Sequence, residues 1–224
     1  MSILSNLELI RRVPLFSTLT QSQAEAVAQA VVKQRFKRGD VIVTQGEKSN
    51  RLAILLTGRA RVLTTDEERG REVILATLSP GDYLGEMSLI DNQPHSATVR
   101  ADIQTDVLLL GRTEFARCLG ENSAMAYAVM KGLVQRLRQA DRKIESLALM
   151  DVYGRVARVL TESATEETPG RWVIRGKVSR QDVAKMIGAS REMVSRVIKD
   201  LEERGFIQTL EDGNTLIQDR LIRP

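Results

Sequence analysis

The last quarter of the chain carries a concentrated cluster of basic side chains. Between Arg171 and Lys199 the sequence holds eight Lys or Arg residues and two acidic residues, a local excess of six positive charges, whereas the whole chain carries only +4. A focused basic patch suits an anionic partner such as a phosphate backbone. A solvated surface would show the same charges, so charge alone leaves both interpretations open.

The same region has the pattern of two short helices joined by a tight turn. Ser179 and Ser190 are typical N-cap residues for helices over residues 180–187 and 191–203. Residues 165–170 are expected to form a loop, and residues 206–218 predict a β-hairpin around an Asp-Gly turn. Together these elements predict a helix-turn-helix followed by a wing.

Apolar positions indicate which face of the second helix meets solvent. Four residues at helical spacing would pack the two helices together: Val183, Ile187, Val194 and Leu201. An outward arginine suits O6 and N7 of guanine, an outward glutamate suits the cytosine amino group, and a serine at a helix start suits a phosphate. Surface charges and simple caps are the alternative. The predicted DNA-contacting residues are Ser179, Arg180, Gln181, Ser190, Arg191, Glu192, Ser195, Arg196 and Lys199.

Residues 178–201 read VSRQDVAKMIGASREMVSRVIKDL. This segment resembles the helix-turn-helix signature of the cyclic-AMP receptor protein family of bacterial transcription regulators, which includes the fumarate-nitrate reductase regulators. The resemblance implies a homodimer that binds double-stranded DNA at an inverted repeat and contacts RNA polymerase.

Two short amphipathic segments, residues 2–12 and 21–32, predict helices near the start of the chain. A β-rich region follows between residues 34 and 112. Six short runs are separated by glycine turns, a pattern typical of an antiparallel sandwich or barrel. The runs are Val41–Val43, Leu52–Leu56, Ala60–Leu63, Val73–Leu78, Ala97–Arg100 and Val107–Leu110.

Residues 84–99, LGEMSLIDNQPHSATV, resemble the phosphate-binding cassette of the family's β-roll. The resemblance implies that Glu86 accepts a hydrogen bond from a ribose hydroxyl and that Ser96 binds a cyclic phosphate. The family has an arginine where this chain has His95, and a mostly neutral histidine offers one donor in place of a permanent charged fork. A loop residue with no ligand role is the alternative for His95. The predicted contacts in this segment are Gly85, Glu86, Met87, Ser88, His95, Ser96 and Ala97.

Residues 123–148 predict one long helix. Apolar or small residues alternate at intervals of four and three: Ala126, Met130, Leu133, Leu137, Ala140, Ile144 and Leu147. This narrow heptad seam predicts a two-stranded coiled coil and therefore a homodimer. A helix packed on its own domain is the alternative.

Arg138, Asp141 and Arg142 of this helix are predicted to meet the base of the effector. Residues 147–152 resemble the family's hinge, which aligns Ala140 and Asp141 with hydroxyl residues that meet adenine in cyclic-AMP-responsive members. A carboxylate only accepts hydrogen bonds and pairs well with the N–H groups of guanine. The Arg138–Asp141 spacing also resembles elements that hold cyclic di-GMP, although a surface ion pair would give the same pattern. Cyclic di-GMP and cyclic AMP both stay open as the effector.

The whole chain is expected to have an α+β fold in three parts. An N-terminal cyclic-nucleotide-binding β-roll, antiparallel and jelly-roll-like, would span residues 1–122. A coiled-coil dimerisation helix with its hinge would span residues 123–150, and a winged helix-turn-helix DNA-binding domain would span residues 151–224. Allosteric control by a cyclic nucleotide is expected. A regulator of the same fold that is active without ligand, or that takes another effector, is the alternative.

Composition excludes several other classes of site. The single cysteine, Cys118, excludes a disulfide, a CxxC zinc site and an iron–sulfur cluster within one chain. The single histidine gives a metal site or a haem little support. No apolar run approaches 18 residues, so we expect no membrane partner and a cytoplasmic location. No catalytic constellation is recognisable, so the protein is not expected to be an enzyme.

Overall fold

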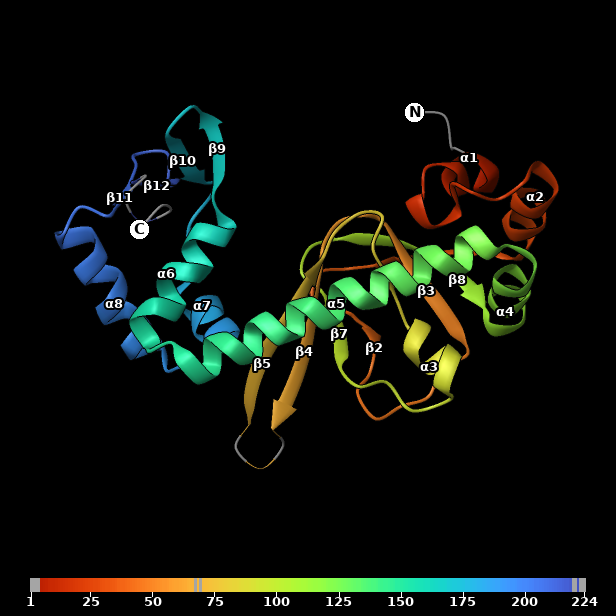
Figure 1. Cartoon of the computed structure of the whole chain (residues 1–224), viewed down its shortest axis with the longest axis horizontal. Coiled ribbons are helices and arrows are strands. Elements are labelled where there is room, and N and C mark those ends of the chain that lie inside the picture. The colour runs from red at the N-terminus through yellow and green to blue at the C-terminus, as the bar shows by residue number, and fades with distance from the viewer. Residues whose placement is uncertain (1–4, 67, 69, 219–220, 222–224) are drawn as a thin grey trace. The chain divides into compact units, whose positions relative to one another are not determined.

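The computed structural model describes residues 5–66, 68, 70–218 and 221 of the 224-residue chain. The chain forms two compact units, Met1–Leu137 and Arg138–Pro224. The long helix α5 (Ser123–Leu149) contributes residues to both (Figure 1).

The first unit contains two antiparallel four-stranded sheets. One has the strand order β1-β8-β3-β6 and the other the order β2-β7-β4-β5. Their strands are β1 (Val32–Phe36), β2 (Val41–Val43), β3 (Arg51–Thr57), β4 (Ala60–Asp66), β5 (Arg71–Leu78), β6 (Tyr83–Leu84), β7 (Thr98–Ala101) and β8 (Thr105–Gly111). Most neighbours in a sheet are distant in sequence, as expected for the predicted jelly-roll-like β-roll.

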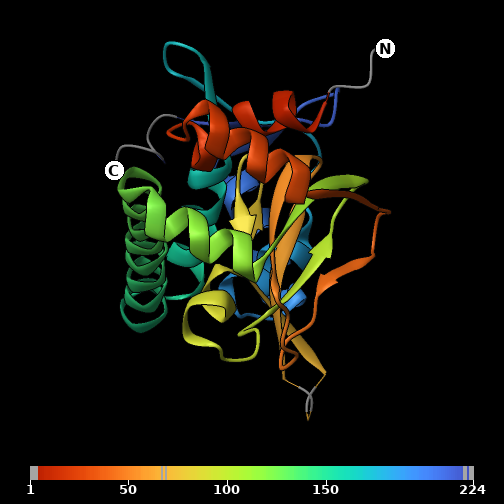
Figure 2. The same ribbon diagram turned by 90° about the vertical axis from the view of Figure 1, so that its right-hand side faces the viewer.

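Short helices accompany these sheets. They are α1 (Asn6–Arg11), a 3₁₀ helix (Pro14–Phe16), α2 (Gln21–Ala30), α3 (Glu86–Asp91) and α4 (Arg112–Glu121). Ser5 and Thr20 begin α1 and α2 with capping boxes, each formed with the residue three positions on. Helices α1 and α2 lie together at one end of the sheets (Figure 2).

The sheet that contains β3 is a middle layer. Successive side chains of a strand point to opposite faces. Leu52 and Ile54 of β3 therefore join a core formed with the helices, whereas Ala53 and Leu55 join a core formed with the other sheet. This explains why β3 has a continuous apolar run in place of an alternating pattern.

The sequence prediction of this unit was wrong at several boundaries. The helix predicted over residues 21–32 ends at Ala30, because Val32 begins strand β1, which pairs with β8. Helix α4 was not predicted. Its N-cap, Gly111, has no capping side chain, and Phe115 and Cys118 bury only one narrow face. The short strand β6 was also missed.

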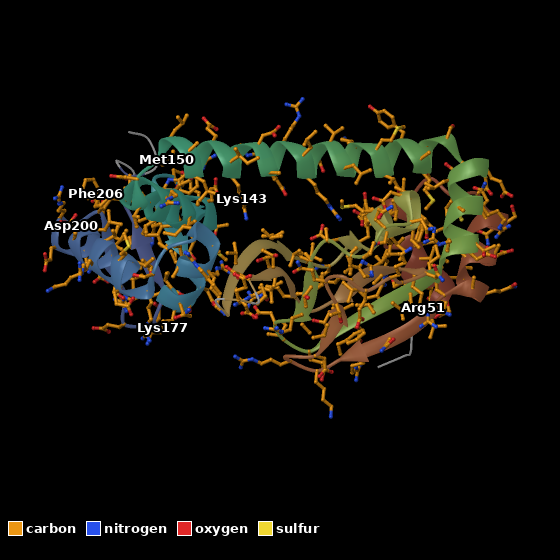
Figure 3. All side chains as sticks on the ribbon, turned by 90° about the horizontal axis from the view of Figure 1, so that it is seen from below. Arg51, Lys143, Met150, Lys177, Asp200 and Phe206 are labelled. Carbon is orange, nitrogen blue, oxygen red and sulfur yellow. The ribbon has the colours of Figure 1, made fainter. Side chains whose placement is uncertain are left out.

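The burial of side chains along α5 contradicts part of the predicted coiled-coil seam. Met125 and Val129 are buried, and Leu133 is partly buried against the core of the first unit. Leu133 is therefore occupied within its own domain. The large apolar residues exposed on α5 are Tyr127, Met130, Val134, Leu137, Ile144, Leu147 and Leu149. A row of side chains projects from α5 on the side away from the sheets (Figure 3).

The second unit is the predicted winged helix-turn-helix. Besides the end of α5 it contains α6 (Val152–Ser163), α7 (Arg180–Ile187) and α8 (Arg191–Glu203). Its sheet has the order β11-β12-β10-β9, formed by β9 (Thr165–Thr168), β10 (Arg171–Ile174), β11 (Ile207–Thr209) and β12 (Thr215–Ile217). Residues 165–168 were predicted as a loop, and that was wrong because they pair with β10. The four residues expected to pack the two helices are all buried, which confirms that part of the prediction.

Candidate effector and DNA-binding sites

A cavity in the first unit brings together all seven residues predicted from the cassette. We call it the α3 cavity. Its lining consists of Val43, Val62, Leu78, Leu84, Gly85, Glu86, Met87, Ser88, His95, Ser96, Ala97, Val99 and Arg136. Apolar side chains from both sheets therefore face a small set of polar groups, which is the usual composition of a small-molecule site.

Local backbone geometry places the polar groups. Gly85 turns the chain from β6 into α3 with φ of 89°, and a Cβ atom there would lie 2.8 Å from the carbonyl oxygen of Arg51. Only glycine fits this turn without strain. Further along, the backbone N–H of His95 donates to the carbonyl of Glu47 at 2.8 Å, and Gly46 donates to the His95 carbonyl at 2.9 Å. The loop before β7 is therefore held through both backbone groups of one residue, His95.

Glu86 is paired with an arginine that the sequence analysis missed. Arg136 of α5 donates from Nη1 to Glu86 Oε1 at 2.6 Å, donates from Nη2 to the carbonyl of Tyr83, and lies 5.0 Å from the centre of the Tyr83 ring. The Glu86 side chain is only 1% exposed. Burial raises the pKa of Glu86, and Arg136 opposes that rise. A permanent positive charge therefore lines the cavity although His95 replaces the family's arginine.

His95 is buried beside α3. Its Nδ1 lies 3.1 Å from the hydroxyl of Ser88, and burial lowers its pKa while the nearby Glu47 opposes that decrease. The ring is therefore neutral at pH 7. When the Ser88 hydroxyl donates to Nδ1, the proton of the neutral ring lies on Nε2 and can be donated elsewhere.

Two buried polar atoms of this cavity have no hydrogen-bond partner among the described residues. They are Oε2 of Glu86 and Nε2 of His95. Leaving such groups unpaired costs stability, so an orphaned donor or acceptor at a cavity indicates a place for a ligand. Glu86 offers an acceptor, and His95 offers a donor in the tautomer in which Ser88 donates to Nδ1, which together fit a ligand with both hydroxyl and anionic groups.

Arg138, Asp141 and Arg142 are exposed on α5 and belong to the second unit. Their predicted contact with an effector base stays a prediction.

Helix α8 exposes four of the nine predicted DNA-contacting side chains. Arg191, Glu192, Arg196 and Lys199 are exposed. Hydrogen bonds from its own backbone N–H and from Ser190 lower the pKa of Glu192, so this carboxylate stays ionised as an acceptor. Helix α8 therefore offers donors and an acceptor along one exposed surface.

Serine hydroxyls define the starts of α7 and α8 as predicted. Ser179 accepts from the backbone N–H of Asp182, and Ser190 accepts from that of Met193, each at 3.2 Å. Ser195 donates to the carbonyl of Arg191 at 2.8 Å, so its hydroxyl has only acceptor capacity left for a partner. At the start of α7, Ser179 and Gln181 are exposed and Arg180 is half-buried.

Two family models match the two units of the chain. Residues 33–122 match the model described as cyclic nucleotide-binding domain, and residues 154–221 match the Crp-like helix-turn-helix domain. The chain is 32% identical over 194 residues to the cAMP-activated global transcriptional regulator Vfr of Pseudomonas aeruginosa, covering 83% of this chain and 88% of Vfr. The chain belongs to the cyclic-AMP receptor protein family. It is accordingly a DNA-binding transcription regulator with a cyclic nucleotide-binding domain, not an enzyme.

A second relative supports this family, and two solved structures share the fold. The cAMP-activated global transcriptional regulator CRP of Salmonella typhimurium is 31% identical over 188 residues, covering 82% of this chain and 87% of that protein. The c-di-GMP responsive global regulator CLP of Xanthomonas campestris has a similar structure, with a TM-score of 0.74 at 23% identity over 89% of this chain and 99% of that chain. A CooA mutant from Carboxydothermus hydrogenoformans gives 0.76 at 19% identity over 99% and 95% of the two chains.

In the part of the chain that the structure describes, no helix is long and apolar enough to cross a membrane. Over the same residues, no group of three His, Cys, Asp or Glu side chains gathers in a way that could hold a metal ion.

Proposed function

We propose that this family member is a homodimeric regulator that reads an inverted DNA repeat and is controlled by a cyclic nucleotide bound in the α3 cavity. The observation that carries the effector site is the pair of buried, unpartnered atoms, Glu86 Oε2 and His95 Nε2, on one cavity. A cavity that only leaves space in an apolar core would gain nothing from buried polar atoms without partners. A bound ligand with complementary groups would satisfy both.

The polar groups divide into two sets that suit the two ends of a ribose cyclic phosphate. Glu86 would accept from a ribose hydroxyl, as the family resemblance implies. Ser96 and His95 would donate to phosphate oxygens, and Arg136 would supply the positive charge that a neutral imidazole lacks. In this proposal Met87, Ser88 and Ala97 shape the wall of the site, with Gly85 allowing the turn.

The base of the effector would decide between two nucleotides. Asp141 would accept from the N1–H and N2–H₂ groups of a guanine, with Arg138 and Arg142 nearby on the helix, which favours cyclic di-GMP. Vfr is named a cAMP-activated regulator and CLP a c-di-GMP responsive one, so the family contains both classes. Asp141 could also accept a hydrogen bond from the amino group of adenine, so cyclic AMP is the second candidate effector.

A second copy of the chain would cover the exposed row on α5. Tyr127, Met130, Val134, Leu137 and Ile144 are exposed and follow alternating three- and four-residue steps with one position, Asp141, completing the series. A stripe with this period faces a second helix of the same kind in a coiled coil. This differs from the seam expected at first, because Leu133 packs within its own domain.

The proposed DNA contacts combine base reading with phosphate binding. Arg191, Glu192 and Arg196 of α8 would meet base edges in the major groove, with Ser195 and Lys199 beside them. Ser179, Arg180, Gln181 and Ser190 would hold the backbone from the helix starts. RNA polymerase would be the protein partner, and the cytoplasm, where the DNA lies, the place of action.

A calorimetric titration of the full chain tests the effector. Cyclic AMP, cyclic GMP and cyclic di-GMP would each be titrated into wild type, Glu86→Gln and Asp141→Ser. We expect one nucleotide to bind wild type and to bind Glu86→Gln more weakly. If Asp141→Ser weakens only a guanine nucleotide, the guanine assignment is supported. Measuring DNA binding with and without the nucleotide then tests whether the nucleotide regulates the protein.

A regulator that is active without ligand is the second candidate. The Arg136–Glu86 pair, with 2.6 Å between the charged atoms, already satisfies half of the Glu86 carboxylate. Tight binding to specific DNA with no response to any of the three nucleotides would select this candidate over the first.

A further inference from the structure

We propose that Arg112, the first residue of α4, is a positioning residue that holds the cassette helix α3 in the conformation that binds the effector. This inference rests on the proposed binding of a nucleotide in the α3 cavity. Arg112 does not line that cavity and belongs to none of the motifs recognised in the sequence.

Arg112 uses all of its guanidinium nitrogens on α3 and its surroundings. Nη1 donates to the carbonyl of Leu89 at 2.9 Å, and Nη2 donates to the carbonyl of Ser88 at 3.0 Å and to Asn92 Oδ1 at 3.3 Å. Nε donates to Asn50 Oδ1 at 3.1 Å, and the Arg112 backbone N–H donates to the Asn50 carbonyl at 2.8 Å. One side chain therefore ties α3, the loop before β3 and the start of α4 together.

Helix α3 needs such an external partner. The last four carbonyls of any α-helix have no intrahelical donor. Because α3 has only six residues, these four are most of its carbonyls. Two of these carbonyls receive the Arg112 fork. Charge-assisted hydrogen bonds of this kind are stronger than neutral ones, and the planar fork fixes direction as well as distance.

The end of α3 adopts a conformation that the surroundings must hold. Asn92, with φ of 59°, is the only non-glycine residue of positive φ recorded for the described part of the chain. Such a conformation costs free energy and persists where neighbouring groups fix it. The bond from Arg112 to the Asn92 side chain is one of those restraints.

Arg112 thereby controls the polar groups of the cavity indirectly. Ser88 is held through its carbonyl by Arg112 and through its hydroxyl by His95 Nδ1. Glu86 lies at the other end of the same short helix. Loosening α3 would change the burial of His95 and the direction of Glu86 without removing either group.

The chain contains a single histidine, so its ring protons report on this region alone. The experiment measures the titration of His95 by proton NMR in the full-length protein without nucleotide. The other charged groups near the ring are Glu47, and Glu86 and Arg136 on the same cavity, and none of them is altered. Because burial lowers the pKa of His95, Arg112→Ala should raise the midpoint towards the ordinary value of 6.5.

Two further variants distinguish the loss of the Arg112 hydrogen bonds from the loss of its positive charge and from a failure to fold. Arg112→Lys keeps the positive charge but cannot fork to four acceptors, so it should also raise the midpoint. It serves in place of Arg112→Ala if the alanine variant does not fold. Arg117→Ala removes an arginine from the same helix, where it pairs with the half-buried Glu114, and should leave the midpoint unchanged.

Calorimetry with cyclic AMP and cyclic di-GMP gives the second measurement. Both Arg112 variants should bind the active nucleotide about 10-fold to 100-fold more weakly, as expected for loss of a group that orients binding residues. A His95 midpoint in Arg112→Ala and Arg112→Lys equal to that of wild type would overturn the inference. If wild type binds neither nucleotide, the proposed function fails at that point, while the His95 midpoint still decides the role of Arg112.

Discussion

Replacing Arg136 by methionine should destabilise the first unit by about 3.5–4 kcal/mol at pH 7. Arg136 Nη1 lies 2.6 Å from Glu86, whose side chain is 1% exposed, so the substitution leaves a carboxylate uncompensated in a site that water hardly reaches. Removing one partner of a buried pair costs about 3–5 kcal/mol. The lower end applies because the Arg136 side chain is 37% exposed. Loss of the contact with the Tyr83 ring adds about 0.5–1 kcal/mol.

The loss should shrink as the pH falls. Burial already raises the pKa of Glu86 above its ordinary value of 4.5, and without Arg136 the pKa rises further. The folded state then binds a proton at a pH where the unfolded state does not. A raised carboxyl pKa gives a stabilisation that is present below the ordinary pKa and is lost as the pH rises through the raised one. The variant should therefore recover stability progressively as the pH is lowered from 7 towards the ordinary carboxyl value of 4.5.

Thermal unfolding followed by circular dichroism measures the effect. Trp172 is the only tryptophan and lies in the second unit, so its fluorescence reports that unit separately and should not shift. Glu86→Gln combined with Arg136→Met removes both charges and should regain most of the lost stability. Arg117→Met breaks a partly exposed pair and should change little. An Arg136→Met protein as stable as wild type at pH 7, with no pH dependence, would refute the reasoning.

Three further outcomes are expected. Leu137→Lys places a charge in the exposed row of α5 and should give monomers that lose DNA binding, whereas an intact dimer by equilibrium sedimentation would contradict the coiled-coil interface. Arg191→Ala and Arg196→Ala should each cost about 1–3 kcal/mol on specific DNA and relax preference at one base pair, and equal losses on random DNA would mean phosphate contact alone. His95→Arg should tighten nucleotide binding by about 10-fold to 100-fold. If His95 binds phosphate as the charged imidazolium, the affinity of wild type should rise below pH 6.5, and the variant should lose this rise. A calorimetric titration at several pH values measures both effects.

The helix-turn-helix could be predicted almost residue by residue. Helices α7 and α8 have the predicted bounds, and Ser179 and Ser190 cap them as expected. A serine side chain bonds a backbone N–H only three positions away, and an apolar face repeats every three or four residues. Both signals are contained in a short window of sequence. The same holds for the residues of the cassette, because one continuous segment supplies seven of the groups that line the α3 cavity.

The sequence did not predict the groups that reach these segments from elsewhere. Arg136 is 50 positions from Glu86, and Arg112 is 20 or more from the α3 atoms that it binds. Nothing in their immediate neighbours marks either arginine, since each lies on a helix among other charged residues. Their partners depend on how α4 and α5 pack against the sheets.

Local sequence patterns are enough to identify the helices and strands, their caps and turns, and the residue types that a nucleotide and DNA require. Which stripe of α5 is covered by its own domain depends on the folded structure, in which Val129 is buried, Leu133 is partly buried and Val134 is exposed. The predicted seam and the exposed row share Met130, Leu137 and Ile144 and differ by one residue at the positions between them. They look alike in sequence, because a helix repeat of 3.6 residues is compatible with either. Burial against residues distant in the chain distinguishes them, and that same packing pairs Glu86 with Arg136 and leaves His95 neutral.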